Sequence, residues 1–390
     1  MSRPPTEMGA QGDWLFLRGT RGPTPGSQNT VRLVDLFSGA GGMTLGAAEA
    51  ARSMGLATEV VLAMEFRDPI RAVYDANFDS SLSNLRGDVR NRFNGDLGDK
   101  LTVEERSTAR QVGHIDILLG GPPCQGHSNL NNHTRRRDPK NGLYLRMIRA
   151  VEVIEPAAVI IENVPTVRLD SAEVVAKATT RLNELGYSTN EIVVAANRLG
   201  VPQLRTRHLL VGTRDVAAPT DDSLDRYESG ERDLEWAIGD LALEPAHGLF
   251  TSASVISSEN LKRARYLLRH AKYDLPNHLR PPCHRNKTHS YKSMYGRLAW
   301  NQPAQTITTG FGSPGQGRYL HPDLPRTLTP HEAARLQFFP DWFDFSPATY
   351  RTILAECIGN AVPPKVVFCL SRIVLAAMGA KPSVRTQLAG

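Results

Sequence analysis

The feature that most constrains the fold is a repeated alternation of short apolar runs with helical patterns between residues 30 and 214. Because these runs are rich in β-branched residues and apolar on both faces, they predict strands buried between two layers of helices. Strands are predicted at 31–37, 59–64, 114–120, 157–163, 191–196 and 208–212, and helices from Met43 and at 68–77, 144–154 and 171–185. The alternation predicts an α/β fold, a doubly wound and mostly parallel sheet.

Composition suggests how the rest of the chain is organised. Residues 1–29 are rich in Pro, Gly, Ser and Thr and show no sustained periodicity, which predicts a flexible tail before the sheet domain of residues 30–214. After residue 214 the alternation stops, so residues 215–325 are expected to form a second, smaller and less regular domain. Residues 326–390 return to helical patterns, in PHEAARLQ and KVVFCLSRIVLAAM, and are expected to pack back onto the sheet domain.

The positive charge of the chain is unevenly distributed. The formal net charge of +6 says little by itself. Residues 221–244 contain nine acidic residues and two arginines, whereas residues 276–318 contain no acidic residue. The acid-free stretch interleaves basic and aromatic residues: Arg280, Arg285, Lys287, Lys292, Arg297 and Arg318 with Tyr291, Tyr295, Trp300 and Phe311. The pattern suits a polyanion such as nucleic acid, and it suits a solvated loop surface equally well.

Several classes of protein are disfavoured by the sequence. The four cysteines, Cys124, Cys283, Cys357 and Cys369, are scattered without a CxxC pair, which argues against a disulfide scaffold and a four-thiol zinc site. CHRNKTH offers a single thiol, so no metal site is predicted. No apolar run has the length of a membrane span, and WLFL is too short for a signal-peptide core, so a soluble intracellular protein is expected.

Small and acidic residues follow the first predicted strands. DLFSGAGGMT opens a helix, and its small residues let a ligand approach the backbone and the helix N-terminus. Gly39 and Gly41 fit the first two positions of a dinucleotide fingerprint, but Thr44 occupies the third. Glu65 ends the second strand, and Asp88 lies in GDVR near the expected end of a third. Together they predict a nucleotide-type site at the strand ends, while a tight turn and a helix cap remain alternatives.

Reactive side chains follow the later strands. Cys124, in LLGGPPCQGHSN, stands behind two prolines that stiffen the backbone, and a thiol at a strand end suits a nucleophile as well as a buried core residue. Glu162 ends a further strand and is a candidate general acid. The spacing of Gln203, Arg205 and Arg207 predicts one face of a strand, with two guanidinium groups pointing the same way. Each of the last two elements is also consistent with a solvated edge.

Taken together and in this order, these segments resemble the cytosine-5 DNA methyltransferases, which use S-adenosylmethionine. The resemblance covers residues 31–370, through DLFSGAGG, Glu65, GDVR, GGPPCQG, NGLYLRMIRAVEVIEP, IENV, QLRTR, LTPHEAARLQFFPD and IGNAVPP. It implies a Rossmann-like methyltransferase domain, and a target recognition domain that contains the acid-free stretch on its DNA side. The chain departs from the family at His127, where an aromatic residue is usual, and at His331, where arginine is common.

The resemblance implies a role for each matching position. Seven positions correspond to the cofactor pocket: Phe37, Gly39, Ala40 and Gly42 along the cofactor, Glu65 at its ribose, Asp88 at its adenine amino group, and Asn360 at the C-terminal end of the pocket. Four positions correspond to the catalytic machinery: Cys124 as the nucleophile, Glu162 at ring nitrogen 3 of the target base, and Arg205 and Arg207 at the base and the nearby backbone.

The chemistry of such an enzyme needs these residue types together. Carbon 5 of cytosine becomes nucleophilic only after a thiolate adds to carbon 6, and the base must first be flipped out of the duplex. The polar loop HSNLNNHTRRRDPKNG carries Arg135, Arg136 and Arg137, which are expected to reach phosphates as the loop closes over the base. No metal is required by this chemistry.

The expected enzyme is the modification methyltransferase of a prokaryotic restriction-modification system, or a solitary relative. Its expected partners are double-stranded DNA and a cognate restriction endonuclease, and it is expected to be a cytoplasmic monomer that associates with the nucleoid through DNA, not with a membrane. Two alternatives remain: an RNA cytosine methyltransferase of similar fold, and a catalytically silent DNA-binding relative. A nicotinamide oxidoreductase is disfavoured because Thr44 breaks the dinucleotide fingerprint.

Overall fold

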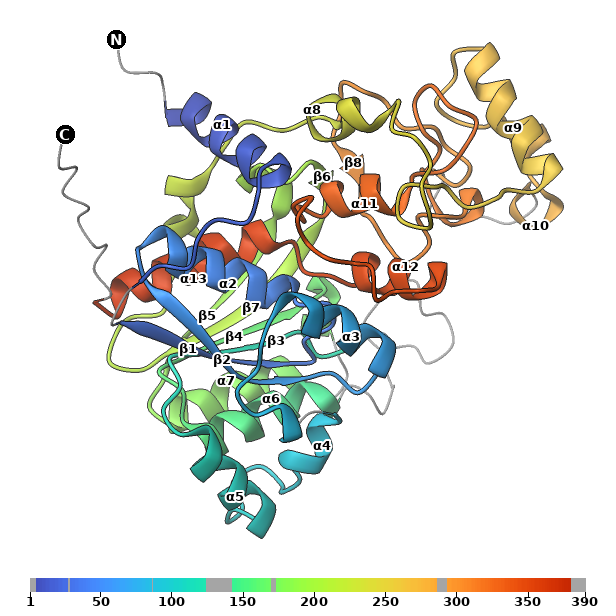
Figure 1. The fold of residues 1–390 in the computed structure, drawn as a ribbon. Helices are drawn as coiled ribbons and strands as arrows, with labels where there is room; N and C mark the ends of the chain where they lie inside the picture. Colours follow the sequence, from blue (N-terminus) through green and yellow to red (C-terminus); the bar gives the residue numbers. More distant parts are fainter. Residues whose placement is uncertain are drawn as a thin grey trace, which may run out of the picture. The chain divides into compact units, whose positions relative to one another are not determined.

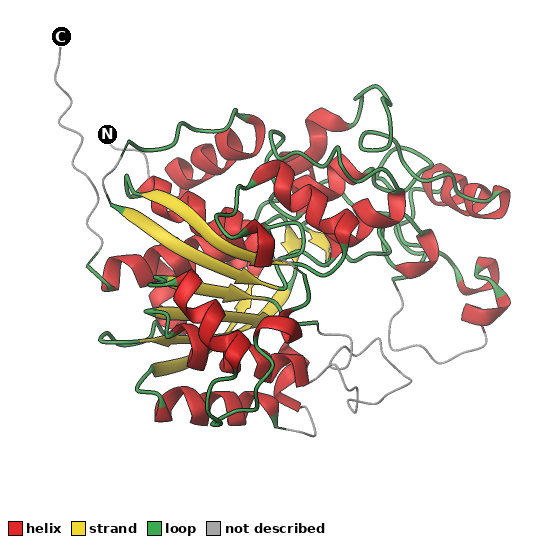
Figure 2. Ribbon diagram, turned by 60° about the horizontal axis from the view of Figure 1, so that its bottom comes forward, coloured by secondary structure: helices red, strands yellow, loops and turns green. Residues whose placement is uncertain are grey.

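The computed structural model describes residues 5–26, 29–85, 87–123, 142–169, 173–285 and 293–379 (Figures 1 and 2). The chain divides into two compact units, which are described separately. The first, called the sheet unit, comprises residues 21–195, 206–228 and 362–390. The other, called the second unit, comprises residues 1–20, 196–205 and 229–361.

A six-stranded sheet forms the centre of the sheet unit, with the strand order β2-β1-β3-β4-β7-β5. The strands are β1 (Thr30–Leu36), β2 (Ala57–Met64), β3 (Ile117–Gly120), β4 (Ala158–Asn163), β5 (Ser188–Ala195) and β7 (Thr206–Thr213). β1 pairs in parallel with β2 and β3, and β3 with β4, whereas β7 runs antiparallel to β4 and β5. The predicted doubly wound, mostly parallel sheet is confirmed, with one antiparallel strand in it.

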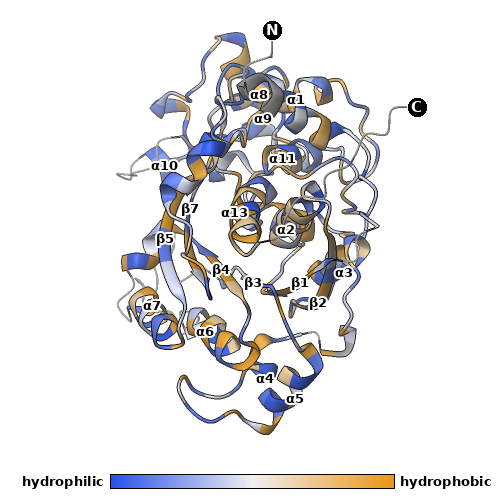
Figure 3. Ribbon diagram, turned by 90° about the vertical axis from the view of Figure 1, so that its left-hand side faces the viewer, coloured by the Kyte–Doolittle hydropathy of each residue, from blue (hydrophilic) through white to orange (hydrophobic). Residues whose placement is uncertain are grey.

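Helices cover both faces of this sheet, as Figure 3 shows. One face carries α2 (Gly42–Ser53) and α13 (Pro364–Ala377); the other carries α4 (Val89–Arg92), α5 (Val103–Val112), α6 (Gly142–Ile154) and α7 (Val174–Glu184). The remaining elements of this unit are α3 (Asp68–Asn77) and the short 3-10 helices η1 (Ser83–Leu85), η3 (Pro165–Leu169) and η5 (Asp221–Tyr227). These layers hold the strand ends in place.

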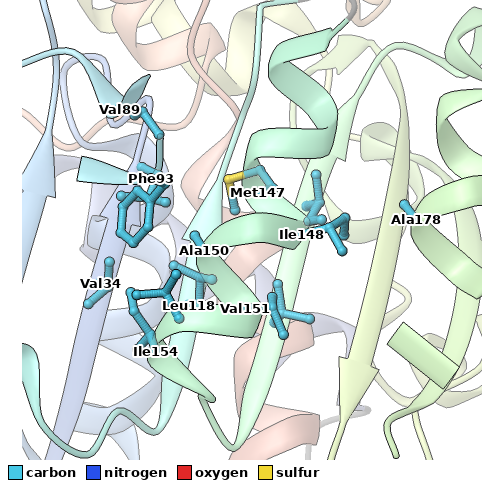
Figure 4. Close-up of a cluster of buried hydrophobic side chains, with 14 of the residues drawn as sticks. Val34, Val89, Phe93, Leu118, Met147, Ile148, Ala150, Val151, Ile154 and Ala178 are labelled. Carbon is cyan, nitrogen blue, oxygen red and sulfur yellow. The ribbon is translucent and has the colours of Figure 1, made fainter. Parts of the chain in front are cut away.

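The core of the sheet unit lies between the sheet and the layer that contains α6 (Figure 4). Val34 of β1 and Leu118 of β3 pack with Ile148 and Val151 of α6, and all four side chains have no exposed surface. Full burial of an aliphatic side chain contributes about 1.5–3 kcal/mol to the free energy of unfolding. The apolar runs that predict the strands therefore also account for their rigidity.

The opposite face depends on a close contact between two helices that are far apart in the sequence. A Cβ atom at Gly46 of α2 would collide with the carbonyl oxygen of Pro364 and would lie 2.8 Å from Cβ of Val367 in α13. Only glycine lets the two helix backbones approach this closely. The C-terminal helix thus packs directly on the helix that begins after β1.

The second unit is much less regular. Its helices are α1 (Pro5–Arg18), α8 (Leu234–Ile238), α9 (Ser258–Arg269), α10 (Pro282–Arg285), α11 (Pro330–Leu336) and α12 (Arg351–Gly359). It also contains the 3-10 helices η4 (Ala196–Leu199), η6 (Gly239–Leu241), η7 (Asn277–Leu279) and η8 (Pro314–Gln316). Its small parallel sheet pairs β6 (Gln203–Leu204) with β8 (Ala304–Gln305).

The N-terminal segment differs from its expected form. Residues 5–18 are helical, Leu17 has no exposed surface, and the ring of Phe16 stacks on that of Phe338 at 5.8 Å. Arg18 pairs with Asp240 at 2.7 Å. The prediction of a flexible tail was wrong for this segment, because its partners lie more than 200 residues away in the sequence.

The C-terminal boundary also differs. Residues 326–361, expected to return to the sheet domain, belong to the second unit, and the chain returns to the sheet unit from residue 362. Helix α11 is tied to the second unit because Arg335 pairs with Asp240 at 2.9 Å and with Asp341 at 2.5 Å. A helical apolar stripe shows that a helix is packed but does not identify its partner.

One stretch of the described residues, Arg351–Ala377, is long and apolar enough to cross a membrane, and 67% of its most apolar 18-residue segment is buried. It comprises two helices, α12 and α13, which belong to different units. Because buried core helices meet the same criterion, the stretch is weak evidence for a membrane span.

Candidate active site

A tight loop joins β1 to α2 and carries four of the predicted cofactor residues. Ala40 and Gly42 are buried, whereas Phe37 and Gly39 are partly exposed. Phe37 and Gly39 have left-handed backbone angles, with φ of 58° and 55°. Since a phenylalanine rarely adopts this conformation, the loop is held by its surroundings.

Two glycines of this loop have different reasons to be glycine. A Cβ atom at Gly41, whose φ is 97°, would lie 2.5 Å from the ring of Phe78, so packing requires glycine there. A Cβ atom at Gly39 would meet nothing within 4 Å. Gly41 is also the N-cap of α2 and makes no side-chain cap hydrogen bond, whereas the Asp35 carboxylate accepts the backbone N–H of Thr44 in the first turn. The loop therefore leaves open space beside Gly39, where a ligand can approach the backbone.

Glu65 lies beside this open space. It follows the last residue of β2, is 8% exposed, and accepts backbone hydrogen bonds from Arg67, at 2.9 Å, and Gly39. Burial raises the pKa of its carboxyl group, and these hydrogen bonds partly oppose the effect. Phe66 is 63% exposed. The sequence interpretation missed Phe66, although an aromatic residue directly after a strand-end carboxylate is a recognisable signal for a planar ligand.

Asp88 does not end a strand. It is the N-cap of α4, where it accepts the backbone N–H of Arg90 at 2.9 Å and pairs with the Arg90 guanidinium at 2.6 Å. The side-chain hydrogen bonds from Arg90 lower the pKa of Asp88. The prediction of a strand end was wrong here, because GDV is equally typical of a helix N-terminus. The adenine-binding role of Asp88 stays a prediction.

The ends of β3 and β4 meet next to the loop. A Cβ atom at Gly121 would lie 3.5 Å from Oε2 of Glu162 and 3.8 Å from the sulfur of Met43. The side chain of Asn163 donates to the carbonyl oxygen of Pro122 at 3.3 Å and so ties the two strand ends together. Cys124 and His127, and the loop with three successive arginines, lie outside the described residues.

Glu162 and Arg207 form an ion pair at this edge. Nε of Arg207 lies 2.6 Å from Oε1 of Glu162, and the side chains are 12% and 11% exposed. They approach because β4 and β7 are antiparallel neighbours, with Glu162 opposite Leu209. A nearly buried pair of this kind holds the carboxyl group in one orientation.

Gln203, Arg205 and Arg207 do not share one strand. Gln203 belongs to β6, Arg207 to β7, and these strands lie in different sheets. Arg205 is 2% exposed and donates to the carbonyl oxygens of Ile307 at 2.7 Å and Ala361 at 2.8 Å within the second unit. The prediction of two guanidinium groups on one strand face was wrong, because the alternation continues across the break between the strands. Arg205 instead anchors the backbone of the second unit.

Asn360 is the C-cap of α12 in the second unit, and its side chain is exposed. Its predicted place at the cofactor is not tested by this position and stays a prediction.

His331 replaces the usual arginine without loss of positive charge. Its Nδ1 lies 2.9 Å from Oε2 of Glu244, and its Nε2 lies 2.9 Å from Oδ1 of Asp341. Both ring nitrogens must be protonated to donate to both carboxylates. Burial alone would lower the pKa of His331, but the hydrogen bonds that its ring donates to the two carboxylates outweigh this effect and raise the pKa.

The described residues contain no group of three His, Cys, Asp or Glu side chains that could hold a metal ion. Of the cysteines that the structure describes, Cys283 is exposed, and Cys357 and Cys369 are buried.

Comparison with known proteins places this geometry in a family. The family model of the C-5 cytosine-specific DNA methylases matches residues 31–374. The chain belongs to this family. It is 43% identical over 358 residues to the type II methyltransferase M1.BsuMI of Bacillus subtilis, covering 92% of this chain and 83% of the relative. It is 31% identical over 347 residues to the type II methylase M.HgiDII of Herpetosiphon aurantiacus, covering 85% and 91% of the two chains.

Solved structures resemble this methylase in fold. The Schizosaccharomyces pombe Dnmt2 methyltransferase aligns with a TM-score of 0.61 at 18% identity, covering 89% of this chain and 99% of that one. The Entamoeba histolytica methyltransferase EhMeth aligns with a TM-score of 0.58 at 16% identity, covering 90% and 99%. At these identities the likeness shows the fold alone. The family match shows that the protein is a DNA (cytosine-5-)-methyltransferase.

S-adenosylmethionine is the methyl donor that a methyltransferase of this family implies. The residues after β1 and β2 fit it: the space beside Gly39 is open, and Glu65 offers a nearly buried carboxylate for hydroxyl groups. The exposed ring of Phe66 adds a surface for a flat base.

Proposed function

We propose that this methylase transfers a methyl group to carbon 5 of a specific cytosine in double-stranded DNA, through a transient bond between Cys124 and carbon 6 of a flipped-out base. The observation that carries the proposal is the ion pair between Glu162 and Arg207, which lies beside Gly121, three residues before Cys124. An acid and a cation are thus held at the same strand ends as the expected nucleophile.

The sulfur of Cys124 forms the new bond to carbon 6, and the electron pair of the ring double bond moves to carbon 5. Carbon 5 then takes the methyl group from the sulfonium, whose carbon–sulfur bond would break and leave a neutral thioether. Glu162 stabilises the ring charge by donating a hydrogen bond to nitrogen 3. Because Arg207 already engages the Glu162 carboxylate, the proton for this hydrogen bond has to arrive as the base enters. Loss of the carbon 5 proton then expels the thiolate and restores the ring.

S-adenosylmethionine supplies the methyl group as a sulfonium. Phe37, Gly39, Ala40 and Gly42 line its site, Glu65 accepts hydrogen bonds from its ribose, and Phe66 packs against its adenine. Asp88, at the adenine amino group, has to share its carboxylate with Arg90. Asn360 closes the site from the C-terminal end. This assignment is supported by the open space beside Gly39 and by the burial of Glu65.

The biological setting belongs to the same proposal. The similarity to type II methyltransferases supports a role as the modification enzyme of a restriction-modification system, with a cognate endonuclease that recognises the same sequence. We place the protein in the cytoplasm as a monomer on DNA. The role that the resemblance implies for Arg205, at the base and the nearby backbone, stays part of this proposal.

A duplex that contains 5-fluorocytosine tests the proposal, because the fluorine blocks the elimination that releases Cys124. The wild-type enzyme should form a covalent complex that resists denaturing electrophoresis, and Cys124→Ser should form none. Cys283→Ser is the matched control, since Cys283 is an exposed cysteine outside the proposed site, and it should trap DNA as the wild type does.

Absence of a wild-type adduct, or an adduct that survives Cys124→Ser, would refute the covalent mechanism. Methyl transfer from radiolabelled S-adenosylmethionine to tRNA and not to duplex DNA would instead identify an RNA substrate.

A further inference from the structure

The arginines of the acid-free stretch do not all provide free positive charge. Arg297 donates to the carbonyl oxygens of Lys272 at 3.1 Å and Pro322 at 2.6 Å. Arg318 donates to the carbonyl oxygen of Arg297 at 3.1 Å and pairs with Asp274 at 2.6 Å. These two guanidinium groups connect loops within the second unit, so a polyanion has to be met by other side chains.

Helix α9, directly before this stretch, is amphipathic and firmly seated. Its buried residues Ala264 and Leu267 pack in an apolar cluster with Leu275, Tyr295 and Leu320. The guanidinium of Arg263, on the same helix, donates to the carbonyl oxygen of Leu279 at 3.0 Å. Exposed side chains of α9, the helix labelled in Figure 1, therefore stand on a fixed support.

The other side of α9 carries cations that are not used inside the unit. Arg265 and Arg269 are exposed, stand four residues apart and so lie on one helix face. Lys272, also exposed, follows in the turn after the helix, where Ala271 has a φ of 49°. Within the described part of the chain, none of these three side chains takes part in a hydrogen bond or ion pair, whereas Lys262 pairs with Glu259 at 2.7 Å.

We propose that Arg265, Arg269 and Lys272 form a contact surface for the phosphate backbone of duplex DNA, outside the target base. Arg265 and Arg269 are about 6 Å apart along the helix axis at 1.5 Å per residue, and a DNA strand places a phosphate every 3.4 Å along its axis. The inference rests on the proposed function, because it adds a contact to the same DNA substrate.

The composition of this face selects a phosphate backbone over a membrane. A helix that lies on a membrane exposes an apolar face beside its charges, whereas Ala264 and Leu267 of α9 are buried in their own unit. The three cations act as point charges without base readout, so the surface binds DNA of any sequence and raises affinity without changing specificity.

The triple variant Arg265→Gln/Arg269→Gln/Lys272→Gln tests the surface, since glutamine keeps helix propensity and removes charge. Each lost phosphate contact lowers the slope of log K against log salt by about 0.9, so the slope should become shallower by about 2.7. The matched control is Lys100→Gln/Arg110→Gln/Lys177→Gln, three exposed cations of the sheet unit, and its slope should stay that of the wild type. A charge-retaining triple with lysine at 265 and 269 and arginine at 272 should also keep the wild-type slope.

Equal slopes for the α9 triple and the wild type would overturn the inference, as would an equal loss in the control triple. Loss of binding to phosphatidylserine vesicles with unchanged DNA binding would assign the face to a membrane and would also overturn it. The salt dependence of DNA binding is measured independently of the covalent mechanism. At saturating DNA and low salt, the α9 triple should still form the covalent complex with 5-fluorocytosine DNA. If the wild type formed no such complex, the proposed mechanism would fail, but the salt slopes would still test the DNA contact of α9.

Discussion

A single methyl group added at Gly46 should separate two opposing effects on the sheet unit. Gly46 lies within α2, where alanine would ordinarily stabilise the helix by about 1 kcal/mol relative to glycine. Here the added Cβ atom would collide with the carbonyl oxygen of Pro364 and would lie 2.8 Å from Cβ of Val367. Ordinary contact begins at 3.4 Å, so α2 and α13 would have to separate by 0.6 Å (3.4 − 2.8) or more.

Overpacking of a well-packed contact costs about 1–3 kcal/mol, and a collision with backbone belongs at the upper end of this range because a carbonyl oxygen cannot change rotamer. After the gain in helix propensity, Gly46→Ala should lower the free energy of unfolding by about 2 kcal/mol. For a unit of this size each kcal/mol lowers the melting temperature by about 2–4 °C. A decrease of roughly 4–8 °C is expected.

The same substitution should weaken cofactor binding, because α2 begins at the loop with Gly39 and Gly41. Thermal denaturation followed by circular dichroism gives the first quantity, and titration calorimetry with S-adenosylmethionine gives the second. The matched control is Gly12→Ala in α1, where a Cβ atom would meet nothing within 4 Å, so this variant should keep or raise the melting temperature. If Gly46→Ala is as stable as the wild type and binds the cofactor equally well, the backbone contact between α2 and α13 does not exist.

Three further predictions concern buried charges. Glu105→Ala should lower the free energy of unfolding by about 1–3 kcal/mol in urea denaturation, because the guanidinium of Arg149, which is 1% exposed, loses its pairing with Glu105 at 2.6 Å and keeps Glu152 as its remaining carboxylate partner. His331 has a raised pKa, so its contribution to stability is complete below about 6.5 and is lost as pH rises through the raised value; His331→Gln should abolish this loss in a pH series of melting temperatures. Burial raises the pKa of Asp35 to about 7, whereas the unfolded chain releases this proton near 3.8. The free energy of unfolding should therefore fall by up to about 4 kcal/mol as pH rises from 3.8 to about 7. Asp35→Asn should flatten that part of the pH profile.

Each of these three results has a clear contrary. A loss below 1 kcal/mol for Glu105→Ala would mean that Arg149 finds water or another acceptor. Unchanged pH profiles in the His331 and Asp35 variants would assign the pH dependence of stability to other groups.

The sheet was predictable from the sequence because its strands are buried on both faces. Runs such as VRLVDLF and AAVIIEN have few alternatives once helices flank them. The strand ends then indicated where Glu65 and Glu162 would lie, and the structure places both there. A strand that is buried on both faces is marked by a short run of apolar residues, so the sequence alone indicates the strand and the residues at its end.

The errors have a common physical origin, which is that local patterns do not contain tertiary partners. Alternation of side chains is the same on either side of the break at Arg205, and the carbonyl oxygens that hold this residue come from positions 307 and 361. The partner of Arg18 lies at Asp240, so the Gly- and Pro-rich N-terminal segment looked unsupported. Asp88 and its neighbours read the same at a strand end and at a helix start.

The contact between α2 and α13 also bears on how the protein is made. α2 ends at Ser53 and α13 begins at Pro364, so the helix that supports the cofactor loop is synthesised after every other described element. During translation, the part of this sheet face that α13 covers stays exposed until α13 leaves the ribosome, and buried residues of α13 such as Val367 and Leu370 then close it. Cofactor binding can therefore report when a nascent chain has completed its fold.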